Sequence, residues 1–310
     1  MISVIIPHLN QPEALRFCLR SLCGQEGVRQ PVEFIVVDNG SKAKPTAICS
    51  SFPAVRLLSQ PIPGPGPARN LGASYANGEI LAFIDADCIA DANWLGEIER
   101  RFLQDPQIAV LGGDVRIAYQ DPCRLTLLEA YESVFAYRMK EYIARQGFTG
   151  TGNLAVRREV FLAVGPFGGI EIAEDRDWGQ RALGQGYRTH YCPNMIVYHP
   201  ARRTFGDLAR KWRRHTIHDF ARIQSKSGWR LRWVLRSVAV ALSPPAELVR
   251  IASSERLKGW RPRALAFLGV VLIRFYRSGI MLALAAGVRA SELNGGWNLA
   301  APSAPPRDRS

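Results

Sequence analysis

The first hundred residues alternate between short apolar runs and stretches with helical spacing. The apolar runs predict strands over residues 3–7, 32–37, 55–58 and 80–84. Leu15, Leu19 and Leu22 recur at helical spacing, and helices are predicted over residues 12–23, 67–77 and 91–103. Strands and helices that alternate at this spacing are typical of a mostly parallel sheet flanked by helices. We therefore expect an α/β fold.

The run 80–84 is apolar throughout and ends at Asp85-Ala86-Asp87. A run of this kind predicts a buried central strand that delivers two acids to the carboxyl edge of the sheet, where open α/β sheets hold ligands. If the chain stays extended, Asp85 and Asp87 project to one side with Ala86 opposite, and both reach one divalent cation. A solvated turn after the strand explains the same residues.

The chain after residue 107 predicts antiparallel strands and then an amphipathic helix over residues 124–142. A second helix is predicted to begin near Glu171 and to end at Gly184 or Gly186. Its first turns contain Glu174, Asp175 and Asp177. Helix capping explains acids at such a position, but the acids here exceed what capping requires.

Two loops have the composition of backbone that lies close to a ligand. Residues 61–67 alternate Pro with Gly, and Arg69 and Asn70 follow in a first helical turn, where an anion is favoured. Gly152 and Asn153 end a loop rich in Gly and Thr. For residues 61–67 the alternative is a plain surface loop, and for the loop that ends at Gly152 and Asn153 it is a tight turn.

Composition and charge narrow the class of protein. With 310 residues, 47% of them hydrophobic and 22% charged, the chain can bury a large core. Residues 1–200 have a net charge of −2 and residues 201–277 a net charge of +14, so the formal +13 lies in one C-terminal segment. Six Cys without a C-x-x-C pair indicate free thiols in a reducing compartment. No secretory signal is apparent at the N-terminus.

The basic C-terminal third predicts long helices. Residues 205–223 form a basic stretch interleaved with aromatics, and 231–251 and 264–288 are apolar with interspersed Arg. The last segment is long enough to span a membrane, but Arg274 and Arg277 at its middle are costly there. We therefore expect it to lie in the membrane interface with its arginines toward anionic headgroups. A second core or an oligomer interface is the alternative. A disordered tail is expected over 291–310.

Taken in order, these pieces resemble the family 2 glycosyltransferases, inverting enzymes of the GT-A fold. The resemblance spans roughly residues 2–200 and covers several motifs. Those motifs are the opening strand 4–10, the strand 33–41 ending in Asp38, the segment 68–72, the Asp85-Ala86-Asp87 motif, Glu174-Asp175, and His199. His8 stands where the family more usually has Thr or Ser.

The resemblance implies roles for individual residues. Metal ligands are expected at Asp85, Asp87 and His199, with Mn²⁺ or Mg²⁺ as the cation. Asp175 is expected to be the catalytic base, beside Glu174. The residues expected to bind the nucleotide-sugar are Pro7, Asn10, Asp38, Arg69, Asn70, Asp85, Gly152 and Asn153. Trp178, Trp212 and Arg213 are expected to contact the acceptor or the diphosphate.

The sequence thus predicts a catalytic GT-A domain over 1–225, a membrane-associating helical region over 226–290 and a tail. Its expected reaction moves a sugar, from a UDP-sugar in particular, to a lipid-linked or polysaccharide acceptor at the inner face of the cell membrane. A nucleotidyltransferase is disfavoured because residues 8–11 are not a basic Gly-rich loop. A nucleic-acid-binding protein would leave the acids unexplained, and an inactive scaffold of the same fold remains an alternative.

Overall fold

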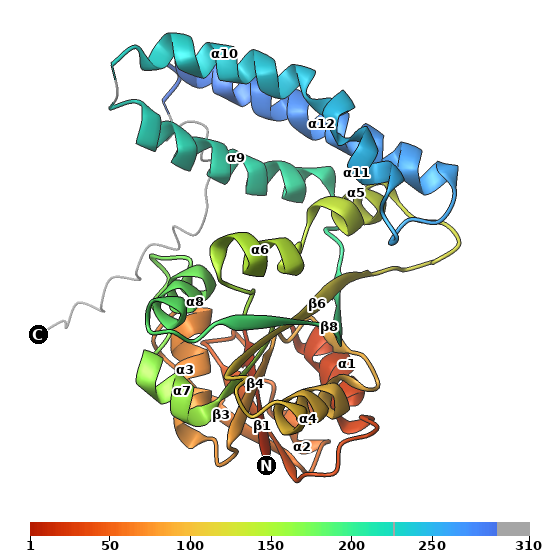
Figure 1. Ribbon diagram of the computed structural model, residues 1–310, viewed down its shortest axis with the longest axis vertical. Helices are drawn as coiled ribbons and strands as arrows, with labels where there is room; N and C mark the ends of the chain where they lie inside the picture. The colour runs from red at the N-terminus through yellow and green to blue at the C-terminus, as the bar shows by residue number, and fades with distance from the viewer. Residues whose placement is uncertain (226, 290–310) are drawn as a thin grey trace, which may run out of the picture. The chain divides into compact units, whose positions relative to one another are not determined.

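The structure is a computed structural model that describes residues 1–225 and 227–289. The chain divides into two compact units. The sheet unit comprises Met1–Pro122 and Phe135–Ala201, and the helical unit comprises Cys123–Val134 and the chain from Arg202 onward (Figure 1). The catalytic segment expected over 1–225 includes residues 205–223, which these contacts group with the helical unit.

The sheet unit is built on one sheet of eight strands among the described residues. The strands are β1 (Ile2–His8), β2 (Val32–Asp38), β3 (Val55–Ser59), β4 (Ile80–Ile84), β5 (Ile89–Ala90), β6 (Val110–Ala118), β7 (Asn153–Arg157) and β8 (Thr189–Pro200). They lie in the order β3-β2-β1-β4-β7-β6-β8-β5. Strands β3, β2, β1 and β4 are parallel, whereas β7 runs antiparallel to both β4 and β6. The predicted mostly parallel sheet is confirmed.

Helices cover both faces of this sheet (Figure 1). They are α1 (Pro12–Cys23), α2 (Thr46–Ser50), α3 (Pro65–Tyr75), α4 (Trp94–Gln104), α6 (Met139–Gln146), α7 (Arg158–Val164) and α8 (Glu174–Gly184). Strand β4 explains the layering, because alternate side chains point to opposite faces. Ile80, Ala82 and Ile84 join one hydrophobic core, and Leu81 and Phe83 join the other.

The first strand, predicted over residues 3–7, is one residue longer at each end. Strand β1 continues to His8, and Pro7 lies beyond the pairing with β4, which covers Ile2–Ile5. One local prediction is wrong. The helix expected over 124–142 is two helices, α5 (Leu127–Phe135) and α6. The chain breaks at Tyr137, which has a φ of +48°.

The helical unit contains most of α5 together with α9 (Phe205–Ile223), α10 (Trp229–Leu242), a 3-10 turn η1 (Pro244–Glu247), α11 (Leu248–Ala252) and α12 (Trp260–Ala285). Helix α9 begins at a capping box in which Thr204 and Asp207 satisfy each other's backbone N–H groups. The apolar segment 231–251 is interrupted at Pro244 and Pro245, which end α10. The tail expected over 291–310 lies outside the described residues.

Candidate active site

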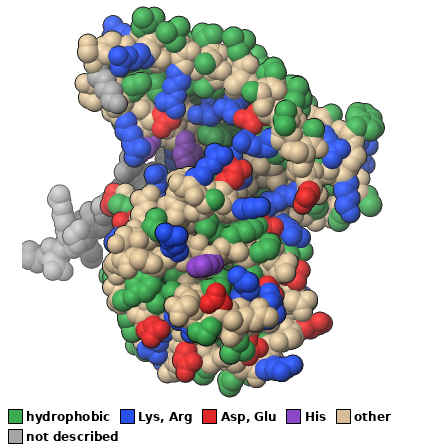
Figure 2. All heavy atoms as spheres, in the orientation of Figure 1, with side chains coloured by type: hydrophobic (Ala, Val, Ile, Leu, Met, Phe, Trp, Pro, Cys, Tyr) green, Lys and Arg blue, Asp and Glu red, His purple; other side chains and the backbone are tan. Residues whose placement is uncertain are grey.

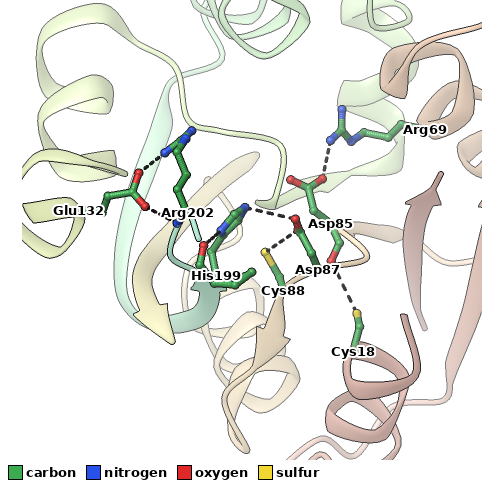
Figure 3. Close-up of polar contacts among 9 residues, drawn as sticks. Cys18, Arg69, Asp85, Asp87, Cys88, Glu132, His199 and Arg202 are labelled. Atoms are coloured by element: carbon green, nitrogen blue, oxygen red, sulfur yellow. Dashed lines mark hydrogen bonds and ion pairs between the residues drawn. The ribbon is translucent and has the colours of Figure 1, made fainter. Parts of the chain in front are cut away.

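The two carboxylates after β4 lie in a turn. The N–H of Cys88 donates to the carbonyl oxygen of Asp85 at 3.0 Å, so the chain is not extended across this motif. The expectation of simple strand alternation is therefore wrong, although Ala86 is buried and both acids are partly exposed. The turn points Asp85 toward Arg69 and Asp87 toward His199 (Figure 3).

His199 lies near the end of β8 and meets Asp87. Its Nδ1 lies 2.8 Å from the carbonyl oxygen of Pro200 and must donate there, because a carbonyl only accepts. This contact leaves the lone pair of Nε2 available, and Nε2 lies 3.6 Å from Oδ2 of Asp87. Two acceptor atoms that face each other at this distance require a cation or a proton.

The donor set fits a divalent cation. A neutral imidazole and carboxylates are ligands that Mn²⁺ accepts readily, whereas Mg²⁺ favours oxygen alone. Burial raises the pKa of the Asp87 carboxyl and the charge of Asp85 raises it further, although His199 opposes this. A bound cation would relieve both penalties. Cys88 also has its Sγ in this group, but burial raises its pKa well above the usual range, so its thiol stays protonated.

Backbone approaches the same carboxylates closely at Gly152. A Cβ on this residue would lie 2.6 Å from Oδ2 of Asp85. Glycine lets the loop before β7 lie against Asp85, because a side chain here would displace the carboxylate. The sequence predicted a close approach of this loop to a bound group, and the structure places it against Asp85.

Arg69 connects the two acidic motifs. Its Nη2 lies 2.6 Å from Asp85, and its Nη1 lies 3.0 Å from Oε1 of Glu174 at the start of α8. The side chain is 4% exposed, so its two ion pairs lie in a setting of low dielectric. One guanidinium thus fixes the distance between the acids after β4 and the acids of α8.

Asp175 follows Glu174 in the first turn of α8. Its Oδ1 accepts from the backbone N–H of Arg176 at 2.7 Å. Burial raises the pKa of its carboxyl above that of an ordinary aspartate, the charge of Glu174 adds to this, and the Arg176 N–H opposes it. A raised pKa makes the ionised carboxylate a stronger base.

The ends of β1 and β2 form a second polar cluster. Nδ1 of His8 lies 3.1 Å from Asp38, and the N–H of Gln11 donates to His8 Nε2 at 3.3 Å. Nε2 is thus an acceptor and Nδ1 carries the proton. Although burial raises the pKa of Asp38, hydrogen bonds from Ser41 and His8 lower it overall. Asn10, at a φ of +53°, accepts from the backbone of Lys42 through its side chain.

Three expected ligand contacts are corrected by the packing. Asn70 exchanges two hydrogen bonds with the backbone of Phe167, at 2.9 and 2.8 Å, which occupy its amide. Asn153 is fully buried and donates to the carbonyl oxygens of Asp114 and Met195. Trp178 is 2% exposed, stacks in the core and donates to the carbonyl of Gly165. These side chains hold the structure rather than line the site.

Trp212 and Arg213 lie on α9 in the helical unit. The ring of Trp212 faces the guanidinium of Arg277 at 4.2 Å. The indole thus has a partner within its own unit. The expected contact of Trp212 and Arg213 with the acceptor or the diphosphate stays a prediction.

Comparison with known proteins agrees with this arrangement. Residues 3–165 match the profile of "Glycosyl transferase family 2". The chain belongs to this family. It is 35% identical over 216 residues to glycosyltransferase AglE of Haloferax volcanii, a match that covers 68% of this chain and 70% of that protein. It is 25% identical over 267 residues to the pre-mycofactocin glycosyltransferase of Mycobacterium tuberculosis, of which the match covers 55%.

Solved structures show that this family 2 glycosyltransferase has the GT-A fold. The mannosyltransferase PcManGT from Pyrobaculum calidifontis, in complex with GDP-Man and Mn²⁺, aligns with a TM-score of 0.52 at 18% identity, over 94% of this chain and 77% of that one. S. aureus TarS 1-349 in complex with UDP-GlcNAc aligns with a TM-score of 0.52 at 17% identity, over 92% of each chain.

Two features of the glycosyltransferase site were missed from the sequence. The double ion pair of Arg69 joins residues 16 and 105 positions away, a relationship that no local pattern contains. The ring of Tyr137 lies against that of His199, with 4.7 Å between the centroids and a tilt of 36°, from a backbone position that non-glycine residues rarely adopt. No motif marks this tyrosine, and only the broken helix places it there.

Proposed function

We propose that the protein transfers a sugar from a nucleoside diphosphate to a hydroxyl group with inversion at the anomeric carbon, and that it requires Mn²⁺ or Mg²⁺. The observation that carries this proposal is the link through Arg69, which places the acids after β4 and the acids of α8 around one buried guanidinium. Diphosphate departure and proton removal need two such groups of charges close together.

Asp87 and His199 would hold the cation, with Asp85 beside them. When bound, the cation supplies Lewis acid stabilisation of the charge that develops on the leaving diphosphate. Tyr137 packs against the imidazole, and the carbonyl of Pro200 holds the tautomer that keeps Nε2 free. These residues thus act by fixing the diphosphate end of the donor.

Asp175 is the proposed base. It would accept the proton of the acceptor hydroxyl as that oxygen attacks the anomeric carbon in line with the leaving group. Glu174 is already paired with Arg69, which fixes its position, whereas Asp175 has no ion pair among the described residues. The raised pKa of Asp175 supports the same division of roles.

The proposed donor is a UDP-sugar. Pro7, Asn10 and Asp38 lie at the ends of β1 and β2, the carboxyl edge where a nucleotide is expected. One solved relative is in complex with GDP-Man and the other with UDP-GlcNAc, so the identity of the donor's nucleobase is to be tested.

The proposed acceptor is lipid-linked or a polysaccharide, in the synthesis of cell-surface glycans, and the enzyme would be peripheral on the cytoplasmic face of the cell membrane. The net charge of +14 over residues 201–277 supports attraction to an anionic surface. Helix α12 is long and apolar enough to cross a membrane by length and composition, with 39% of its most apolar window buried, and that criterion alone is weak.

The test is a panel of nucleotide-sugars with Mn²⁺, read first by thermal stabilisation and then by transfer to water or to an added glycan acceptor. A ligand held by the native state raises the melting temperature by mass action. The product of the best donor should have the opposite anomeric configuration by NMR. Retained configuration, or stabilisation by no nucleotide-sugar, would contradict the proposal.

A further inference from the structure

We propose that α10 and α12 together form a docking surface for a bilayer of anionic phospholipid. The inference rests on the proposed attachment of the enzyme to a membrane and names the side chains that would contact the lipid. It concerns one outer side of the helical unit, distant in sequence from the acids of the catalytic site.

Helix α10 has an apolar stripe exposed to solvent. Its members recur at the spacings of four, three and four residues that keep them on one side of a helix. They are Leu231, Leu235, Val238 and Leu242, exposed by 68%, 59%, 48% and 72%. A soluble helix ordinarily turns such a stripe inward, so this one lacks its covering surface.

Helix α12 repeats the pattern. Leu268, Leu272, Phe275 and Leu282 are all exposed and follow the same helical spacing. Trp260 at the beginning of α12 is 79% exposed. An exposed indole at the end of an apolar helix is typical of the boundary between headgroups and hydrocarbon.

Each stripe lies opposite the side that its helix buries. Both helices turn their other sides toward a shared core, in which Trp233 donates to the carbonyl of Met281 at 2.9 Å and Ser237 meets Ser278 at 2.9 Å. Figure 1 shows α10 and α12 side by side, with α9 next to them. Figure 2 shows green side chains along the edge of this unit where Figure 1 draws α10, with blue side chains beside them.

The mid-helix arginines do not face outward, which corrects the expected orientation of α12. Arg274 pairs with Glu247 at 2.9 Å, and Arg277 is 9% exposed against the ring of Trp212. Because these cations are committed to the inner side, they do not reach headgroups. The same packing occupies α12 with α9 and α10, so the helix presents one face to its surroundings.

Other cations flank the stripe. Arg230 and Arg232 are exposed on α10, one residue to each side of Leu231, and lie about 100° around the helix from it. Lys258 and Arg261 are exposed next to Trp260. Long basic side chains at the margin of an apolar face can reach phosphate groups while the apolar residues enter the acyl region.

Charge decides between a bilayer and a second copy of the chain. Residues 227–289 contain eleven Lys and Arg against two acids, a net charge of +9. Two copies joined face to face would bring like charges together, whereas an anionic bilayer supplies the opposite charge along the whole margin. The bilayer is therefore the occupant to which the surface is complementary.

The test uses the full chain and sucrose-loaded vesicles of phosphatidylcholine alone or mixed with phosphatidylglycerol. The wild type should sediment with the mixed vesicles, and Leu235→Glu combined with Phe275→Glu should weaken this binding at least about tenfold, because charges replace inserted apolar groups. The matched control is Leu103→Glu with Leu162→Glu, two exposed leucines of the sheet unit, which should bind like the wild type. Arg230→Gln with Arg232→Gln should weaken binding to the mixed vesicles only.

Unchanged vesicle binding by the Leu235 and Phe275 variant would overturn the inference, as would a wild-type dimer that this variant dissociates. Donor stabilisation by Mn²⁺ and nucleotide-sugar is measured on the same samples. If the variant loses vesicles but keeps the donor, docking and catalysis are separate. If no sample binds a nucleotide-sugar while the wild type binds vesicles, the proposed function fails and the docking surface stands.

Discussion

The guanidinium of Arg69 lies 2.6 Å from the carboxylate of Asp85. The same guanidinium pairs with Glu174 on α8, so a side chain that is 4% exposed ties the turn after β4 to the helix that carries the proposed base. Arg is suited to this task because its planar fork donates in two directions at once. The position of Asp175 relative to the cation site therefore depends on Arg69.

Replacement of Arg69 should damage both stability and transfer. Arg69→Met leaves two carboxylates without their cation and should lower the free energy of unfolding by about 2–4 kcal/mol. This cost is at the lower end of that for breaking a buried ion pair, because the side chain of Asp85 is one third exposed. Arg69→Lys keeps the charge but cannot bridge both acids, so it should recover only part of the stability that Arg69→Met loses. Urea unfolding measures this, with Arg20→Met on the exposed side of α1 as the control. Equal stability of the Arg69→Met and Arg20→Met variants would contradict the bridging role.

Loss of a proposed metal ligand should be visible without any assay of activity. Titration calorimetry with Mn²⁺ should give about 100-fold weaker binding or worse for Asp87→Asn and for His199→Ala, since each removes a donor atom. His190→Ala changes an exposed histidine of the same strand and should bind Mn²⁺ like the wild type. Binding of Mn²⁺ by His199→Ala with unchanged affinity would exclude His199 as a ligand.

A methyl group at Gly152 should disturb the same centre from the backbone side. Gly152→Ala places its Cβ against Oδ2 of Asp85, and moving that carboxylate should cost about 1–3 kcal/mol of stability and weaken Mn²⁺ binding. Gly184→Ala is the matched control, because a Cβ there meets nothing within 4 Å and Ala favours the end of α8 by up to about 1 kcal/mol. Thermal unfolding with and without Mn²⁺ distinguishes the two variants, and equal behaviour would refute the close approach.

The sequence predicted the sheet and, to within a few residues, the helices α1, α3 and α9. These follow from local periodicity. The proximity of Asp87 and His199 was implied by the family resemblance, and no periodicity contains it. The break at Tyr137 could not be predicted, because no Gly or Pro marks it. The break at Pro244 and Pro245 has a local cause, because proline cannot continue a helix.

The corrections at Asn70 and Asn153 have a common physical reason. Each follows a residue that meets Asp85, and helical or strand geometry turns neighbours in different directions. Asn70 follows Arg69 and Asn153 follows Gly152, yet only the first of each pair meets Asp85. A motif identifies the segment that approaches a ligand, but the side that each residue presents depends on tertiary packing.

The pH dependence of transfer should reflect Asp175. A base must be ionised to accept a proton, so the rate is retained above the pKa of this carboxyl and falls as the pH drops through it. Since burial and Glu174 raise that pKa, the acid limb should lie above the value near 3.9 of a free aspartate. The profile is measured at saturating Mn²⁺ so that the metal ligands stay deprotonated. If the acid limb of the profile does not move in Asp175→Glu, a group other than Asp175 causes it.

The most direct test of the account compares Asp175→Asn with the wild type in single-turnover transfer and in donor binding. The amide keeps the size of the carboxylate but cannot accept the proton, so transfer should fall by about 1,000-fold while the affinity for the nucleotide-sugar with Mn²⁺ changes less than about twofold. Transfer at a rate near that of the wild type would contradict the assignment of the base and, with it, the proposed division of labour around Arg69.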